Sequence, residues 1–272
     1  MFGRWTAMSV LVVVVMLPLS IFAQEWPEPV PIPTAAVQQV QVDYEGVQFR
    51  FDVSLATAVS AANYPATAEG DGPVASPGYT EFTFDGYQAG EYLNYAPQPR
   101  VDVFTIGEFG AYGFYIQQLD QLNQILSTRP DLNQYVNASP GDPNVPNLPF
   151  LPVFNAAQVF RTHPEYIELP QIRGIRYLVY FSQAANPITS GEIFYTFQGI
   201  TDDGQHYVSA ILPVDTGTIT LPFPDMAQDN FGEQYRQYLS DVLGTITATP
   251  EANFSPSLHT LDALAASIMV NR

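Results

Sequence analysis

The tetrapeptide Thr201-Asp202-Asp203-Gly204 is the segment of the chain that most resembles a binding site, because two adjacent carboxylates precede a glycine. Neighbouring carboxylates can present oxygen ligands to Ca²⁺. A calcium loop of the EF-hand type also needs alternating Asp or Asn positions and a closing Glu, whereas Gln205, His206 and Tyr207 follow here. Asp-Gly between two strand-like runs is also a common turn signal. We therefore expect a β-turn, with cation binding as the alternative.

Other oxygen-bearing side chains occur in loop-like stretches: Glu69 and Asp71 in one, Asp142 and Asn144 in another. They would complete a metal site only if the fold brought these distant loops together, and nothing in their spacing requires it. The sequence gives no catalytic, cofactor-binding or metal-ligating residue that we can assign, and we expect no cofactor.

The three histidines are His163, His206 and His259. Nucleophilic catalysis by a Ser-His-Asp set would call for a serine on a strained turn, as in G-x-S-x-G, and the sequence lacks that motif. The H-E-x-x-H, G-x-x-x-x-G-K and G-x-G-x-x-G patterns are missing too. His206 follows Asp203 closely, and His259 precedes Asp262 by about one helical turn. We expect both histidines, and Asp262, on the surface.

Paired carboxylates can also hydrolyse glycosides when they face each other across a cleft. With 27 acidic residues in the chain, a chance pair has little diagnostic value. The many aromatic residues could line a groove that stacks sugars. Tyrosines on strands more often belong to the core, and we expect this of Tyr177, Tyr180, Tyr195 and Tyr207.

Composition narrows the class of protein. The 27 acidic residues face only 9 basic ones, all arginine, which gives a net charge of −18. Such a chain is repelled by phosphate backbones, so we expect no nucleic-acid partner. The chain has no cysteine, which excludes disulfides, thiol catalysis and a lipid-modified N-terminal cysteine.

The N-terminus has the pattern of a secretory signal peptide. A basic start, an apolar run over residues 7–17 and Ala23 before Gln24 predict a signal peptide over 1–23. The apolar run is shorter than the roughly 20 residues that span a bilayer. We expect a secreted or cell-envelope protein that meets the membrane only during export, with a retained anchor as the alternative. A proline-rich linker over 24–36 and a single domain over 37–272 follow.

Period-two alternation predicts most of the strands. A hairpin over 40–53 turns at Glu45-Gly46, residues 58–77 form a loop, and strands follow at 79–87 and 100–106. Short strands are expected at 156–160 and 166–169. The strongest signals, at 175–181, 193–197 and 207–212, are apolar on both faces. We therefore expect these three strands to be adjacent and antiparallel in the centre of a sheet.

Helical spacing predicts three helices. The first covers 112–128, and residues 137–152 are irregular. The second begins at Asn230 with Glu233 as its capping partner, and the third begins at Ser255-Pro256 and continues to the terminus. The apolar stripe of this last helix consists of Leu258, Leu261, Leu264 and Ile268. We therefore expect an α+β fold: a mostly antiparallel central sheet flanked by helices, with the C-terminal helix packed on the sheet.

Two segments, GIRYLVYFSQ (174–183) and YTFQGITDDGQHYVSAILPV (195–214), resemble a block found in exported bacterial proteins of unknown function. The resemblance implies an envelope location and brings no functional residues. More loosely, the early hairpin, the antiparallel sheet and the last helix look like the PsbP/Mog1-type architecture, a likeness of fold alone.

Two hypotheses about function follow. The first is an exported non-enzymatic domain that binds an unknown partner protein or small ligand. The alternative is an exported hydrolase of glycans or esters, with carboxylates and a histidine brought together by the fold. A deep pocket containing a histidine or a close carboxylate pair would favour the hydrolase.

Overall fold

The computed structural model describes residues 38–68, 70, 74–89, 97–138, 145–217 and 219–271. The expected signal peptide (1–23) and linker (24–36) lie outside the described residues. Within the described ranges, no helix combines the length and the apolar character needed to cross a bilayer.

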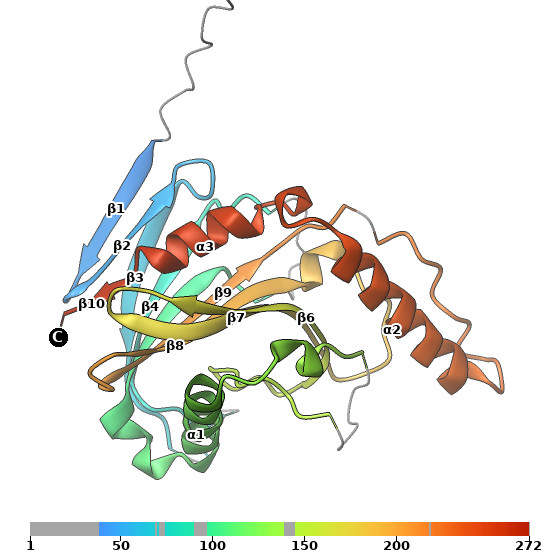
Figure 1. The fold of residues 1–272 in the computed structure, drawn as a ribbon, viewed down its shortest axis with the longest axis horizontal. Helices are drawn as coiled ribbons and strands as arrows, with labels where there is room; N and C mark the ends of the chain where they lie inside the picture. The colour runs from blue at the N-terminus through green and yellow to red at the C-terminus, as the bar shows by residue number, and fades with distance from the viewer. Residues whose placement is uncertain are drawn as a thin grey trace, which may run out of the picture. The chain divides into compact units, whose positions relative to one another are not determined.

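The described chain is an α+β fold built on two antiparallel sheets (Figure 1). The smaller sheet has the strand order β1-β2-β10, and the larger has the order β3-β4-β5-β9-β8-β7-β6. The strands are β1 (Gln39–Tyr44), β2 (Val47–Asp52), β3 (Ala58–Tyr64), β4 (Tyr79–Asp85), β5 (Arg100–Thr105), β6 (Ala157–Glu168), β7 (Ile172–Ser182), β8 (Phe194–Thr201), β9 (His206–Pro213) and β10 (Met269–Val270). The helices are α1 (Gly113–Thr128), α2 (Phe231–Ala248) and α3 (Leu258–Ala266), with short 3₁₀ turns η1 (Ile106–Ala111), η2 (Leu132–Tyr135), η3 (Ser190–Glu192) and η4 (Glu251–Asn253).

The three strands with apolar residues on both faces lie together in the larger sheet, as expected. β8 pairs with β7 on one side and with β9 on the other, both antiparallel. Every residue of β8 and β9 is buried. The four strand tyrosines 177, 180, 195 and 207 are also buried, so their assignment to the core is confirmed.

Helices cover both faces of the larger sheet. Figure 1 shows α2 and α3 on one side of it and α1 on the other. The core on the α2/α3 side includes Leu178 and Tyr195, whereas the core on the α1 side includes Ile175 and Tyr177. Because successive strand residues point to opposite faces, a strand covered on both sides must be apolar at nearly every position.

A pair of glycines lets β7 and β8 approach an aromatic ring. Gly174 and Gly199 lie directly opposite each other in the ladder. A Cβ atom on Gly199 would come within 2.6 Å of the Phe197 ring, and one on Gly174 within 2.7 Å of the same ring. The ring therefore fills the space above both glycines, which explains why this chain has no larger residue at either position.

Two strand predictions were wrong. Residues 58–64, expected to be part of a loop, form β3, which pairs with β4 and is the edge strand of the larger sheet as described. An edge strand with mostly exposed side chains needs little apolar alternation, so its signal is weak. The two short strands expected at 156–160 and 166–169 are one strand, β6. It continues through register shifts on either side of Arg161 and past Pro164, since bulges on an edge strand tolerate proline.

The helices lie where helical spacing placed them, but two caps differ. The side chain of Asn230 makes no capping bond at the start of α2. Helix α3 is capped by Ser257, whose hydroxyl accepts from the Thr260 amide, and not by Ser255. The backbone of Ser255 instead exchanges two hydrogen bonds with Asp215. The helix also ends at Ala266, and the chain then adds β10 to the smaller sheet.

Leu261 tests the docking of α3, because its side chain is fully buried between the sheets. Leu261→Ala should lower the unfolding free energy by about 2–5 kcal/mol, since it removes buried methyl groups and leaves a cavity. Chemical denaturation of both proteins measures this. Met269→Ala, which shortens a side chain that is 40% exposed in β10, is the control and should change stability little. Equal small effects would show that α3 is not packed on the sheet.

Candidate functional site

The acidic tetrapeptide forms the expected turn between β8 and β9. Gly204 has a φ of +69° and its amide donates to the Thr201 carbonyl. The Asp203 carboxylate accepts from the Thr201 hydroxyl at 2.6 Å and from the Gln205 amide at 3.0 Å. These bonds, led by that from Thr201, hold the pKa of Asp203 below its usual value. The Oδ1 atom of Asp203 therefore accepts its hydrogen bonds within the turn. Glu69, Asp71, Asp142 and Asn144 lie outside the described residues.

The histidines are dispersed. His206 is buried on β9, so the expectation of a surface position was wrong. The reason is that β9 is covered on both faces. His163 lies at the irregular part of β6 with a φ of +49°, and its Nε2 is 3.0 Å from the Ile246 carbonyl of α2. His259 is exposed, as expected, and its Nδ1 is 3.5 Å from a Glu251 carboxylate oxygen.

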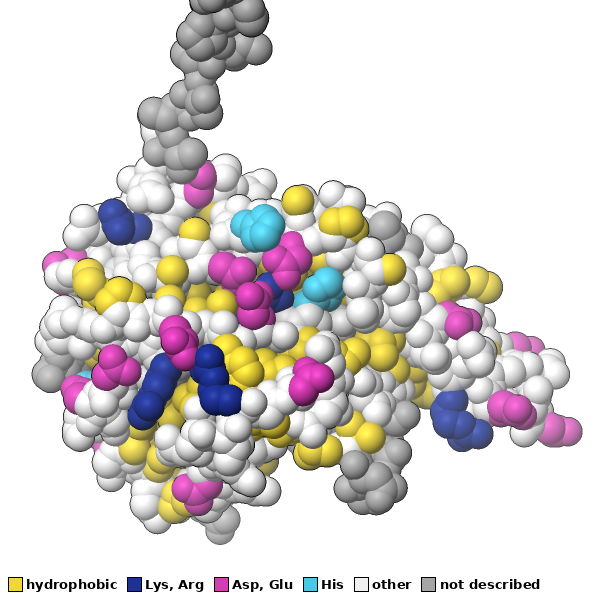
Figure 2. Space-filling model, in the orientation of Figure 1, with side chains coloured by type: hydrophobic (Ala, Val, Ile, Leu, Met, Phe, Trp, Pro, Cys, Tyr) yellow, Lys and Arg dark blue, Asp and Glu magenta, His cyan; other side chains and the backbone are white. Residues whose placement is uncertain are grey.

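A buried arginine gathers acids from distant parts of the chain. Arg176 of β7 is only 2% exposed and is surrounded by Glu165 of β6, Glu251 of η4 and Asp262 of α3, a set we call the Arg176 cluster. One terminal nitrogen of Arg176 donates to both Glu165 and Glu251, and the other donates to the His163 carbonyl at 2.6 Å. Figure 2 shows acidic and histidine side chains grouped around a basic one on this face.

Asp262 was expected to face solvent, and that expectation was wrong. Its Oδ1 accepts from the buried Tyr195 hydroxyl at 3.0 Å and lies 3.5 Å from Arg176 Nε. Asp262 follows Leu258 by four residues, so helical periodicity places it beside the buried stripe. A lone arginine within the apolar run of β7 was the second signal for this cluster, since a buried charge must find a partner.

The charges of the cluster compensate only in part. Burial disfavours the charged form of Arg176, but Asp262, Glu251 and Glu165 outweigh this and raise its pKa. Burial also raises the pKa of Asp262, with Arg176 and the Tyr195 hydroxyl acting in the opposite direction. Three carboxylates thus share one guanidinium. Held this way, they are poorly placed to act as a free acid and base.

Glu251, His259 and Asp262 bring one ligand atom each within 4.8 Å of one another, which is close enough for a shared cation. The Arg176 guanidinium, however, already contacts both of these carboxylates. A cavity of about 510 Å³ adjoins the cluster and is lined by residues that include His163, Glu165 and Glu251. The fold therefore does bring together the residue types that the hydrolase hypothesis requires, but it uses them to join β6, β7, η4 and α3.

A second acid pair lies on β4 and β5. Glu81 and Asp102 are opposite each other in the ladder, and both contact Arg100, at 3.7 and 2.9 Å. Asp102 is fully buried, and its Oδ1 has no hydrogen-bond partner among the described residues. Burial raises the pKa of Asp102 to about 7, although Arg100 opposes the shift. Asp102 lines neither the cavity beside the Arg176 cluster nor the larger one described next.

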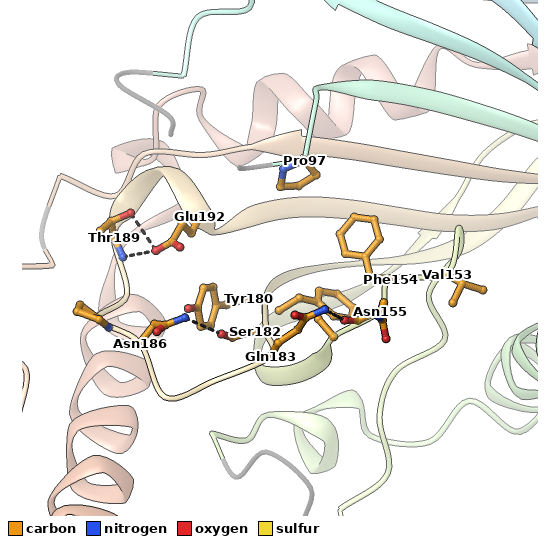
Figure 3. Close-up of a pocket in the computed structure, with 13 residues that line it drawn as sticks. Pro97, Val153, Phe154, Asn155, Tyr180, Ser182, Gln183, Asn186, Thr189 and Glu192 are labelled. Atoms are coloured by element: carbon orange, nitrogen blue, oxygen red, sulfur yellow. Dashed lines mark hydrogen bonds between the residues drawn. The ribbon is translucent and has the colours of Figure 1, made fainter. Parts of the chain in front are cut away.

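A large cavity, which we call the Glu192 pocket, lies at the end of β7. It has a volume of about 850 Å³ and is formed by residues 153–156, the end of β7, the following loop to Glu192, and Pro97. Figure 3 shows Phe154 and Pro97 on one side and Asn186, Thr189 and Glu192 on the other. The sequence analysis assigned no function to these residues. The signal for them was weak, because amides and hydroxyls in a loop are typical of any turn.

Internal hydrogen bonds hold the wall of the Glu192 pocket in place. One carboxylate oxygen of Glu192 accepts from the Thr189 amide at 2.9 Å and from its hydroxyl at 3.0 Å. The Tyr238 hydroxyl of α2 accepts from the buried Ile188 amide at 2.8 Å. The Gln183 side chain donates to the Asn155 carbonyl and so ties the two halves of the rim together. These hydrogen bonds tie the loop to α2 and to the segment at Asn155.

Comparison of the chain with models of known protein families, with curated proteins and with solved structures finds no match. The resemblance of residues 174–183 and 195–214 to exported bacterial proteins of unknown function stays a prediction.

Asp262 provides the test of the Arg176 cluster. Asp262→Ala should lower the unfolding free energy by about 1–3 kcal/mol, because it leaves the buried Tyr195 hydroxyl without its acceptor. Asp262→Asn keeps an oxygen at that position and should cost less. Denaturant titration of both variants measures the difference. Asp241→Ala, at an exposed position of α2, is the control. A loss no larger than that of the control would mean that the cluster does not fasten α3.

The raised pKa of Asp102 predicts a specific pH dependence of stability. The folded protein keeps a proton on Asp102 up to a pH of about 7, whereas the unfolded chain loses it near 3.8. Between these values the folded state binds more protons, so the unfolding free energy falls as the pH rises, by up to ~4 kcal/mol from this group. Asp102→Asn should make the unfolding free energy fall less steeply as the pH rises.

Denaturant titrations over this pH window, of the wild type and the Asn variant, measure the slope. Asp120→Asn, which removes an exposed charge from α1, controls for the loss of a charge as such. An unchanged slope in Asp102→Asn would contradict a raised pKa at this carboxyl.

Proposed function

We propose that this protein is an exported, non-enzymatic domain that binds a small polar ligand in the Glu192 pocket, in the cell envelope or outside the cell. The observation that carries the proposal is the pocket itself: about 850 Å³, with hydrogen-bonding side chains fixed along its wall. Cavities of this size with a few fixed polar groups are the usual sites of small-molecule binding.

The chemistry of the lining favours binding over catalysis. Glu192 is the one carboxylate among the described residues of the lining, and none of them is a histidine. The acids that the hydrolase alternative needs lie instead in the Arg176 cluster, where the guanidinium engages them, and His259 adjoins that cluster through Glu251. Glu192 does accept a hydrogen bond from the Thr189 hydroxyl, but the described lining has no histidine and no second carboxylate to complete a nucleophilic set with this pair.

The net charge of −18 and the residues of the lining both favour a neutral or cationic ligand over an anionic one. No described residue of the lining is cationic, so a phosphate or carboxylate would meet no cationic partner and a repulsive field. The proposal therefore includes no nucleic-acid partner. The residues of the pocket at 180–183 belong to the block that resembles exported bacterial proteins, which supports an envelope location.

A ligand screen tests the proposal. In a thermal-shift screen of neutral and cationic metabolites, a ligand of the pocket raises the melting temperature by mass action. Asn186→Trp should abolish that rise, because Asn186 is an exposed rim residue and the indole would fill the cavity. Gln237→Trp, at an exposed position of α2, is the control and should keep it.

Two results would contradict the proposal. The first would be that every compound that stabilises the wild type stabilises Asn186→Trp equally, which would place binding outside the pocket. The other is turnover of chromogenic glycosides or esters that Glu251→Gln abolishes, which would establish the hydrolase alternative at the Arg176 cluster.

A further inference from the structure

We propose that the ligand of the Glu192 pocket is a neutral saccharide. This inference rests on the proposed function and goes one step further, to the class of ligand. It follows from three features of the lining: the kind of polar groups, the position of the one carboxylate and the arrangement of the aromatic rings.

The polar groups of the wall are mainly amides and hydroxyls. Asn155, Gln183 and Asn186 supply carboxamides, and Ser182 and Thr189 supply hydroxyls. Carboxamides and hydroxyls can each both donate and accept hydrogen bonds. The hydroxyls of a sugar also do both, so a ring of such side chains matches a polyhydroxylated ligand better than one that only donates or only accepts.

The carboxylate of Glu192 adds a strong acceptor. The two bonds from Thr189 both reach Oε2, which fixes the side chain and leaves Oε1 without a bond to the other residues of the lining. A carboxylate accepts several hydrogen bonds, and those it accepts from hydroxyls are shorter and stronger than bonds between neutral groups. Oε1 is therefore suited to accept a hydroxyl of the ligand.

Two of the three aromatic residues of the lining, Phe154 and Phe181, pack against each other and do not surround the cavity, while the third, Tyr180, is buried and stacks on Phe160. Phe154 packs against Phe150 and Phe181 with ring centroids 5.0 and 5.1 Å apart, and Phe181 stacks on Phe194 with an angle of 4° between the rings. These contacts cover part of each ring, and the side chains of Phe154 and Phe181 stay partly exposed. A quaternary ammonium ion needs several open ring faces around it. A single apolar wall suits the C–H face of a sugar ring, with the polar rim opposite (Figure 3).

The experiment uses neutral oligosaccharides as probes: malto-, cello-, xylo- and chito-oligosaccharides, each titrated into the protein and followed by saturation-transfer NMR. We expect at least one series to bind. Glu192→Gln should weaken that binding roughly tenfold or more, the equivalent of losing a hydrogen bond to a charged group. Asn186→Ala, at the exposed rim, should weaken it without affecting folding.

Asp229→Asn, which neutralises an exposed carboxylate before α2, is the matched control and should bind like the wild type. Saccharide binding that Glu192→Gln and Asn186→Ala leave unchanged would overturn the inference. So would failure of all four series. If choline then bound and Asn186→Trp blocked it, the proposed function would stand while the saccharide assignment fell. If nothing bound in the pocket, both would fall.

Discussion

A guanidinium placed on a central strand constrains the rest of this fold. Arg176 lies on β7 between two apolar neighbours, Ile175 and Tyr177, and is almost completely buried. A buried charge without partners costs several kcal/mol or more, and breaking a buried pair by removing one partner typically costs about 3–5 kcal/mol. The chain must therefore bring acceptors to Arg176. It takes them from β6 and from the C-terminal segment, which has to close over the sheet to deliver Glu251 and Asp262.

The closure explains the order of the last elements. After β9 the chain runs through α2 to η4, which carries Glu251, and then enters α3, which carries Asp262. The apolar stripe of α3 supplies most of the burial, while the ion pairs fix the position of the helix along the sheet. Exposed ion pairs add little to stability. A cluster with a fully covered guanidinium instead favours one docking position over neighbouring ones, because a shifted helix would leave charges unpaired.

An element of this fold could be predicted from the sequence when most of its side chains are buried, because burial leaves a regular apolar pattern. The strands over 175–181, 193–197 and 207–212 were predictable because both of their faces are apolar, and so was the stripe of α3. β3 was not, because an exposed edge strand carries little apolar alternation. The partners of Arg176 come from segments distant in sequence, and no spacing rule links 165, 176, 251 and 262. The Glu192 pocket was not predicted for the same reason, because residues 153–156 and 182–192 come together only when β6 pairs with β7.

One helix connects the pocket to the Arg176 cluster. The Tyr238 hydroxyl of α2 accepts from the Ile188 amide and so fixes the pocket loop. At the far end of the same helix, the Ile246 carbonyl oxygen lies 3.0 Å from His163 Nε2. The chain then continues from this end of α2 to Glu251 in η4. A site is held most accurately when its supporting groups lie on rigid elements. The ion pairs that fasten the C-terminal segment thus also help to hold α2, and through Tyr238 they support the loop of the Glu192 pocket.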